Sequence, residues 1–215
     1  MIQLPLEETA LKIDWYFDFI SPFAYFQLRM LDQAHKEVEL NCVPILFGAL
    51  LKHHGHKGPA EIPSKRLMTY RYCQWFADRR GIPFTFPDTH PFKPILPLRL
   101  CLALGGTREV VRDIFNVIWA DGQDLNDPSN LQAFCRRRGF DSVEDRLAAP
   151  AVKDALRRNT DAALRAGVFG VPTIAVADEL FWGADMLELA LAYRANRELF
   201  KSPAYQRLKT LPSGI

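Results

Sequence analysis

The chain has no cysteine pair at C-x-x-C spacing, and this absence argues against several classes of protein. Its four cysteines stand roughly thirty residues apart, at Cys42, Cys73, Cys101 and Cys135. Such spacing is typical neither of a disulfide framework nor of a zinc knuckle. We therefore interpret the thiols as small buried apolar groups in a protein of a reducing compartment.

The chain also lacks long apolar runs and an excess of charge of one sign. No run approaches the roughly 20 apolar residues that cross a bilayer, and the first twelve residues contain Glu7 and Glu8 instead of a basic start followed by an apolar stretch. Twenty-seven basic and 25 acidic side chains leave a formal charge of +2, too little to indicate a nucleic acid or an anionic membrane as partner. We expect a soluble, cytoplasmic protein that binds neither.

The N-terminal part has the pattern of a βαβ unit. Between residues 13 and 19 apolar side chains alternate with more polar ones, which predicts a strand whose less apolar face carries Asp18. Pro22 suits the first turn of a helix that continues to about His35, and residues 38–43 read as a second strand. A strand, helix and strand in this order favour a parallel pair with a right-handed crossover.

The rest of the chain changes character twice. Helical periods predominate after the second strand, and no convincing strand returns until Pro172. Residues 173–177 and 180–182 then predict two strands joined by a tight turn at Asp178-Glu179, and a last helix begins near Asp185. This order predicts an α/β, thioredoxin-like fold interrupted by an all-helical insertion domain. A chain of 215 residues with 48% hydrophobic composition can bury a core of this kind. The pattern divides it into a first thioredoxin-like part (residues 12–46), the helical insertion (47–166), a second thioredoxin-like part (167–200) and a tail (201–215).

Ser21 stands where the first strand meets the helix and is the first candidate for chemistry. The free amide groups in the first turn of a helix favour an anion, and a serine hydroxyl can donate one more hydrogen bond to it. The alternative is that Ser21 only caps its helix, because serine before proline is a common helix start.

Six segments, spread in order between Ile13 and Tyr193, resemble the 2-hydroxychromene-2-carboxylate isomerases, which are relatives of kappa-class glutathione transferases in the DsbA-like thioredoxin branch. The segments are FDFISPFAY (17–25), KGPAEIPSKR (57–66), PFTFP with HPF (83–87 and 90–92), WADG (119–122), VFGVPT (168–173) and LFWGAD (180–185). The resemblance implies a DsbA/kappa-type fold, glutathione as cofactor, a small aromatic acid or other electrophile as partner, and a homodimer.

The resemblance also assigns roles to residues around Ser21. A serine at the position where redox members of this fold have a cysteine suits a protein that takes its thiol from glutathione, so Ser21 would stabilise the glutathione thiolate. The bond between Val171 and Pro172 would be cis, with the Val171 backbone pairing with the cysteinyl unit, although an ordinary trans proline at a strand's first residue is the alternative. Only a thiolate is nucleophilic, which is why the site must lower the pKa of the bound thiol.

Further residues would bind the ends of glutathione. Trp182 and Gly183 precede Asp185, whose carboxylate would receive the γ-glutamyl ammonium, although Asp185 with Glu188 also forms a capping-box pattern. Relatives of the kappa type often have serine where Ala184 stands.

Basic residues lie in the segment after the second strand. By resemblance, Lys65 and Lys57 would meet a glutathione carboxylate. His56 stands where relatives commonly carry asparagine, which leaves its role open. The run 53–56 contains three histidines but has no carboxylate or thiolate partner at ligand spacing, so we expect no metal.

Aromatic residues of the insertion are candidates for the substrate side. By resemblance, Phe92 would cover a flat aromatic acid and Lys93 would pair with its carboxylate. Phe92 and Trp119 each read either as such a cover or as core.

The resemblance predicts a glutathione-dependent isomerase that interconverts 2-hydroxychromene-2-carboxylate and trans-o-hydroxybenzylidenepyruvate in aromatic catabolism. Two alternatives remain open. One is a kappa-like glutathione transferase acting on another electrophile. The other is a non-catalytic thioredoxin-fold module that holds an extended peptide beside Val171-Pro172.

Overall fold

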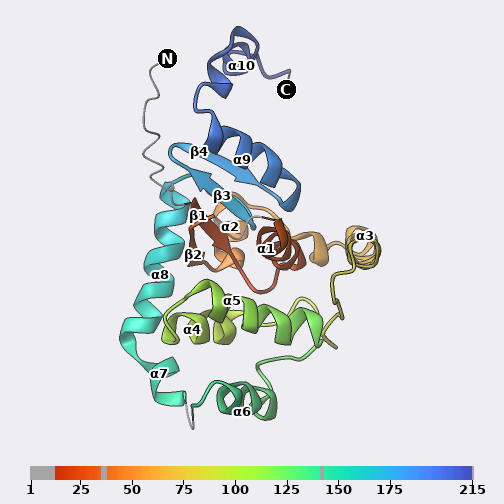
Figure 1. Cartoon of the computed structure of the whole chain (residues 1–215), viewed down its shortest axis with the longest axis vertical. Coiled ribbons are helices and arrows are strands. Elements are labelled where there is room, and N and C mark those ends of the chain that lie inside the picture. The colour runs from red at the N-terminus through yellow and green to blue at the C-terminus, as the bar shows by residue number, and fades with distance from the viewer. Residues whose placement is uncertain (1–12, 35–37, 141–142, 215) are drawn as a thin grey trace, which may run out of the picture.

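The computed structural model describes residues 13–34, 38–140 and 143–214 and is built around a four-stranded mixed sheet in the order β2-β1-β3-β4 (Figure 1). β1 (Ile13–Phe17) pairs in parallel with β2 (Leu40–Pro44) and antiparallel with β3 (Thr173–Val176). β4 (Glu179–Trp182) pairs antiparallel with β3 at the edge of the sheet. The predicted parallel unit and the later hairpin are both confirmed.

The ends of all four strands differ from the sequence prediction. β1 stops at Phe17 instead of continuing to residue 19, and β2 begins at Leu40. The hairpin turn lies one residue earlier than predicted, because Val176 pairs with Glu179 and leaves Ala177 in the turn. Ala177 adopts a φ of 54°, the left-handed conformation that two-residue hairpin turns require.

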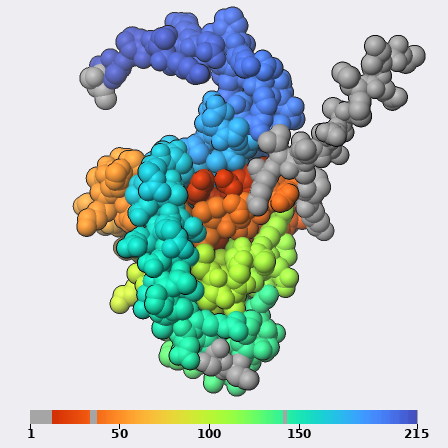
Figure 2. Space-filling view, turned by 90° about the vertical axis from the view of Figure 1, so that its left-hand side faces the viewer, coloured from red at the N-terminus to blue at the C-terminus, as the bar shows by residue number. Residues whose placement is uncertain are grey.

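Alternation along β1 gives the sheet two buried faces. Trp15 faces α1 (Pro22–Ala34) and α9 (Leu187–Ala195), whose apolar side chains form the main core with it. Tyr16 faces the opposite side and packs in a second cluster with α2 (Phe47–His54) and α8 (Pro150–Arg165). Figure 2 shows α8 running down the outside of this face. The two helical layers therefore cover the sheet as in a thioredoxin fold.

Between β2 and β3 the described residues form helices and no strand, as predicted. One core joins them to the sheet, since the ring of Phe115 lies 5.7 Å from that of Phe17 and 4.6 Å from that of Phe19. The boundaries at residues 47 and 166 stay a prediction. The remaining helices are α3 (Pro63–Arg80), α4 (Ile95–Ala103), α5 (Arg108–Phe115), α6 (Pro128–Arg137), α7 (Glu144–Ala148) and α10 (Pro203–Leu208), with short helical turns at Pro59–Glu61, Asn116–Ala120, Ala184–Met186 and Leu199–Lys201.

The four cysteines are free, and three of them are buried while Cys42 is half-buried. Burial raises the pKa of every one of these thiols, to about 12 for Cys42 and Cys73. The interpretation as apolar packing groups is therefore confirmed for the three buried cysteines. Within the described ranges no helix is both long and apolar enough to span a membrane. The tail contains α10, and the side chains of residues 201–214 are exposed at the end of the molecule away from the sheet (Figure 1).

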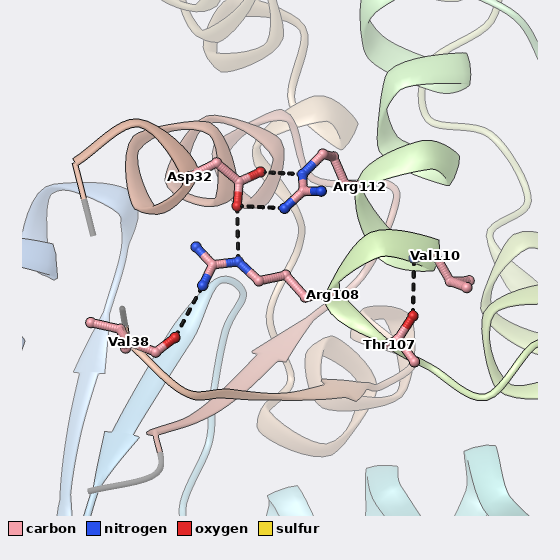
Figure 3. A network of polar contacts seen from close by, with 6 residues as sticks. All are labelled: Asp32, Val38, Thr107, Arg108, Val110 and Arg112. Atoms are coloured by element: carbon pink, nitrogen blue, oxygen red, sulfur yellow. Dashed lines mark hydrogen bonds and ion pairs between the residues drawn. The ribbon is translucent and has the colours of Figure 1, made fainter. Parts of the chain in front are cut away.

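A carboxylate on α1 ties this helix to α5 (Figure 3). Asp32 accepts hydrogen bonds from Arg108 Nε at 2.8 Å and from Arg112 Nε at 2.5 Å. Arg108 also donates to the carbonyl of Val38, at 3.0 Å, so the link extends to the segment that leads into β2. The Asp32 side chain is only 14% exposed, which makes its loss costly because two guanidinium groups would be left without their acceptor.

We expect Asp32→Ala to lower the free energy of unfolding by about 1–3 kcal/mol, between the values for exposed and for buried ion pairs. Urea denaturation of wild type and variant measures this. Asp154→Ala is the matched control: within the described residues Asp154 pairs with Arg157 at an exposed site, and its loss should cost less than about 0.5 kcal/mol. Equal losses in the two variants would contradict a stabilising role for the link between α1 and α5.

Candidate functional site

Ser21 lies at the carboxyl end of β1, directly before the first residue of α1, Pro22. Its side chain is almost buried, with the residue 7% exposed, and its Oγ accepts a hydrogen bond from the amide of Ala24 at 3.3 Å. The expected cap is therefore present. Since the oxygen is the acceptor in this bond, the hydroxyl hydrogen is left for a second partner, so capping and binding an anion do not exclude each other.

The loop before Ser21 is held by a buried carboxyl group. Asp18 is 0% exposed and accepts hydrogen bonds from the amides of Ile20, at 3.1 Å, and Phe47, at 2.9 Å. Burial raises the pKa of Asp18 to about 7, against the opposing effect of these amide bonds. The expectation that Asp18 lies on the less apolar face of a strand was wrong, because β1 ends at Phe17 and the alternation ends with it.

Two aromatic residues of the helical segment bind the carbonyl groups of the same loop. Trp119 Nε1 donates to the carbonyl of Phe19 at 2.8 Å, and His90 Nε2 lies 2.9 Å from the carbonyl of Ile20. Because a carbonyl only accepts, Nε2 carries the hydrogen in this contact. Trp119 is fully buried, in agreement with its alternative assignment as core. The loop is thus fixed by groups that lie about 70 and 100 residues away in the sequence.

His90 and Tyr70 form a half-buried polar pair that the sequence did not reveal. The Tyr70 hydroxyl lies 2.7 Å from both Nδ1 and the carbonyl of His90 and shares its one hydrogen between these two acceptors. Burial lowers the pKa of His90 below its ordinary value, which favours the neutral ring. The bond from His90 to Pro91 is cis. The segment HPF carried the family resemblance, but only the fold shows what its histidine contacts.

The bond between Val171 and Pro172 is cis, as predicted. The Pro172 carbonyl accepts a hydrogen bond from Gly183 N at 2.9 Å, which joins the proline loop to the turn after β4. The Gly183 carbonyl in turn accepts from Gln27 Nε2 at 3.0 Å, and Trp15 Nε1 donates to Gln27 Oε1 at 2.7 Å. The proline loop, the Gly183 turn and α1 are therefore connected through Gln27, a fully buried polar residue that periodicity alone did not single out.

Trp182 forms an exposed rim beside the proline loop. It is 52% exposed, and its ring lies 5.1 Å from that of Phe169. A Cβ atom at Gly170 would collide with the indole, so the absence of a side chain there lets Trp182 lie against the loop backbone.

Asp185 is exposed in the short helical turn Ala184–Met186 that precedes α9. The alternative capping box of Asp185 with Glu188 is not formed, because Met186 is the N-cap of α9 and makes no side-chain cap bond. The Asp185 carboxylate is consequently open to a ligand cation.

The two predicted lysines lie on other elements. Lys57 is in the segment between α2 and the turn Pro59–Glu61, and Lys65 is in the first turn of α3; both are exposed. Within the part of the chain that the structure describes, no ion pair or side-chain hydrogen bond connects either of them to the loop of Ser21. The neighbouring His56 is exposed, and the described residues contain no group of three or more histidines, cysteines or carboxylates arranged to hold a metal.

Phe92 and Lys93 follow the cis bond to Pro91. The Phe92 ring is nearly buried, 6.1 Å from that of His90, whereas the Lys93 side chain is exposed. Asn126 Nδ2 donates to the Lys93 carbonyl at 3.0 Å. Both predicted residues line a cavity of about 440 Å³ beside α4.

This arrangement of a helix start, a capping serine and a cis-proline loop defines a thioredoxin-type site. Residues 12–194 match the sequence profile of the DSBA-like thioredoxin domain, and the chain therefore belongs to this family.

Within the family, the match is to the proteins that the six segments indicate. The 2-hydroxychromene-2-carboxylate isomerase of Sphingobium xenophagum is 30% identical over 196 residues, which cover 84% of this chain and 96% of the relative. Human glutathione S-transferase kappa 1 is 24% identical over 208 residues, covering 86% and 90%. A solved structure of 2-hydroxychromene-2-carboxylate isomerase superposes with a TM-score of 0.73 at 25% identity and covers 89% of this chain and 99% of its own. The resemblance seen in the sequence is confirmed.

The raised pKa of Asp18 predicts how stability depends on pH. Because the folded-state pKa, about 7, lies above the ordinary value of 3.8, ionisation is less favourable in the folded chain than in the unfolded one. The contribution of Asp18 to stability is thus present below the ordinary pKa and is lost as pH rises through the folded-state value. We expect Asp18→Asn to gain stability relative to wild type as pH rises across this window, with no further change above it.

Urea denaturation at several pH values from about 4 to about 8.5 measures the difference in the free energy of unfolding between wild type and variant. Asp161→Asn, at an exposed position of α8, is the control and should keep a constant difference. A constant difference for Asp18→Asn as well would show that Asp18 ionises normally in the folded chain.

Proposed function

We propose that the chain is a glutathione-dependent isomerase that interconverts 2-hydroxychromene-2-carboxylate and trans-o-hydroxybenzylidenepyruvate. One observation carries this proposal: a serine hydroxyl at the start of α1, in a fold whose loop at Val171-Pro172 is cis. The relatives support it, since proteins named as isomerases of this substrate and as kappa-class glutathione transferases match most of the chain.

The residues around Ser21 fit glutathione. The cis bond at Pro172 leaves the Val171 backbone at a loop edge, where an extended peptide can pair with it. The exposed Asp185 carboxylate suits the γ-glutamyl ammonium, and Lys57 and Lys65 suit its carboxylates. Ala184 has no hydroxyl, so a hydrogen bond that serine makes possible is absent at this position.

When bound, glutathione supplies a sulfur nucleophile whose reversible addition at the ring-opening carbon permits rotation about the former double bond. Ser21 donates its hydroxyl hydrogen to the sulfur and so favours the anion over the thiol. A hydrogen bond to a charged acceptor contributes roughly 1.5–3 kcal/mol, and one pKa unit corresponds to about 1.4 kcal/mol, so Ser21 with the helix end lowers the thiol pKa by about one to two units. The groups that fix the loop, Asp18 and His90, keep this hydroxyl in place.

Phe92 and Lys93 form the substrate side in this proposal. The ring of Phe92 covers a flat aromatic acid, and Lys93 approaches its carboxylate. Assembly as a homodimer and a cytoplasmic location belong to the same proposal and stay predictions from the resemblance.

A kappa-like transferase is the second candidate, because the human kappa transferase matches as large a share of the chain, 86%, as the isomerase of Sphingobium xenophagum, 84%. The deciding experiment follows interconversion of 2-hydroxychromene-2-carboxylate with and without glutathione and tracks free glutathione in the same samples. We expect interconversion that requires glutathione without consuming it. Stoichiometric loss of glutathione would favour the transferase, and interconversion that proceeds equally without glutathione would contradict both.

Ser21→Ala should still bind glutathione but raise the pKa of its bound thiol by part of this shift of about one to two units, because the helix end stays in place, with a corresponding loss of rate near neutral pH. Ultraviolet absorbance of the thiolate across a pH titration measures the shift. Ser129→Ala, at an exposed position of α6, is the matched control and should leave the titration unchanged. A Ser21→Ala titration that coincides with that of wild type would remove the proposed role of Ser21.

A further inference from the structure

A cavity of about 440 Å³ lies beside the site, between the residues that precede α2, the segment that leads into α4, and α7. Its size is in the range of about 300–1,000 Å³ that small-molecule sites occupy. Leu46, Phe92, Ile95 and Leu147 form apolar walls, and none of the lining residues is acidic. The cavity therefore suits a compact, largely apolar molecule.

Both walls of the cavity are attached to the loop of Ser21. Leu46 directly precedes Phe47, whose amide donates to Asp18 at 2.9 Å. On the other wall, Phe92 follows His90, whose imidazole contacts the carbonyl of Ile20 at 2.9 Å. Pairing of Phe17 with Pro44 places the residues after β1 and after β2 at the same end of the sheet. The cavity is thus linked to the loop of Ser21 through both walls, although no residue of that loop lines it.

Two cations, Arg99 and Lys93, line the cavity. Arg99, on α4, is half-buried, and its Nε is a buried donor without a hydrogen-bond partner in the described chain. Lys93 lies on the same cavity and has no ion-pair partner in the ranges described. Arg108 and Arg112 differ from these two cations in that they share the carboxylate of Asp32, although Arg108 also has one buried nitrogen, Nη2, without a hydrogen-bond partner in the described chain. A ligand carboxylate in the cavity would give the Arg99 guanidinium and the Lys93 ammonium a partner of opposite charge, with charge-assisted hydrogen bonds.

We propose that Arg99 binds the carboxylate of the substrate and that this cavity selects flat, unsaturated monocarboxylic acids over their neutral analogues. The apolar walls contact the ring, Arg99 fixes the acid group from α4, and Lys93 approaches it from the opposite side. This inference rests on the proposed function in taking the cavity as the substrate side of the Ser21 site. It adds a specificity-determining residue that no sequence segment indicated.

The test compares binding of trans-cinnamate with that of trans-cinnamamide, a neutral analogue of the same shape, by isothermal titration calorimetry with the full chain. Wild type should prefer cinnamate, and Arg99→Gln should weaken cinnamate binding roughly ten- to hundredfold while leaving cinnamamide binding unchanged. Arg99→Lys, which keeps the charge, should restore part of the preference. Arg71→Gln, at an exposed position of α3, is the control and should bind both as wild type does.

Each outcome decides the proposal. Wild type that binds both compounds equally, or Arg99→Gln that loses affinity for both to the same extent, would overturn it. If circular dichroism shows that Arg99→Gln does not fold, the proposal is tested by two other measurements. These are the wild-type preference for cinnamate over cinnamamide and the effect of Lys93→Gln on that preference.

Turnover separates this inference from the proposed function. A rise in KM for 2-hydroxychromene-2-carboxylate in Arg99→Gln, at an unchanged pKa of the bound thiol, supports Arg99 as the carboxylate partner. An active isomerase with wild-type KM in that variant overturns the inference and keeps the isomerase. A wild-type chain that prefers cinnamate but fails to interconvert the chromene acid keeps the inference and refutes the isomerase.

Discussion

The site depends on the hydrogen bonds that satisfy the backbone of the loop from Asp18 to Ser21. A buried loop without regular structure needs partners for its amides and carbonyls, and here side chains provide them. The Asp18 carboxyl binds the amide of Ile20, while His90 and Trp119 bind the carbonyls of Ile20 and Phe19. Two of these three side chains come from the helical segment. The segment therefore supports the geometry of Ser21 as well as contributing the cavity.

The sequence predicted the fold well because each element has a strong local signal. Alternation identified β1, Pro22 marked the start of α1, and Pro172 preceded the return to strands. Strand ends were less predictable: the alternation in the sequence continues to Phe19, but β1 ends at Phe17, where Asp18 turns inward to bind amides. The turn at Ala177 was missed by one residue because alanine in the left-handed conformation has no sequence signal.

The site was predictable only in its motif residues. Ser21, Val171 and Pro172 lie where a segment pattern placed them, because local conformation defines their roles. Gln27 and Arg99 gave no signal, since each is one polar residue in a helix, and its burial depends on elements distant in sequence: Gln27 meets the turn of Gly183, 156 residues away, and Arg99 meets the cavity walls. Burial of a polar group is a tertiary property, and periodicity can only suggest which face of a helix is apolar.

Burial of the cysteines affects how readily electrophiles can modify the chain itself. Alkylation by an electrophile requires a thiolate, and all four cysteines have pKa values raised by burial, with three of them shielded from solvent. A chain of this kind can meet reactive carbonyl and quinone-like compounds repeatedly without becoming covalently modified on sulfur. In the proposed reaction the sulfur nucleophile comes from glutathione, so the chain would not consume its own thiols during turnover.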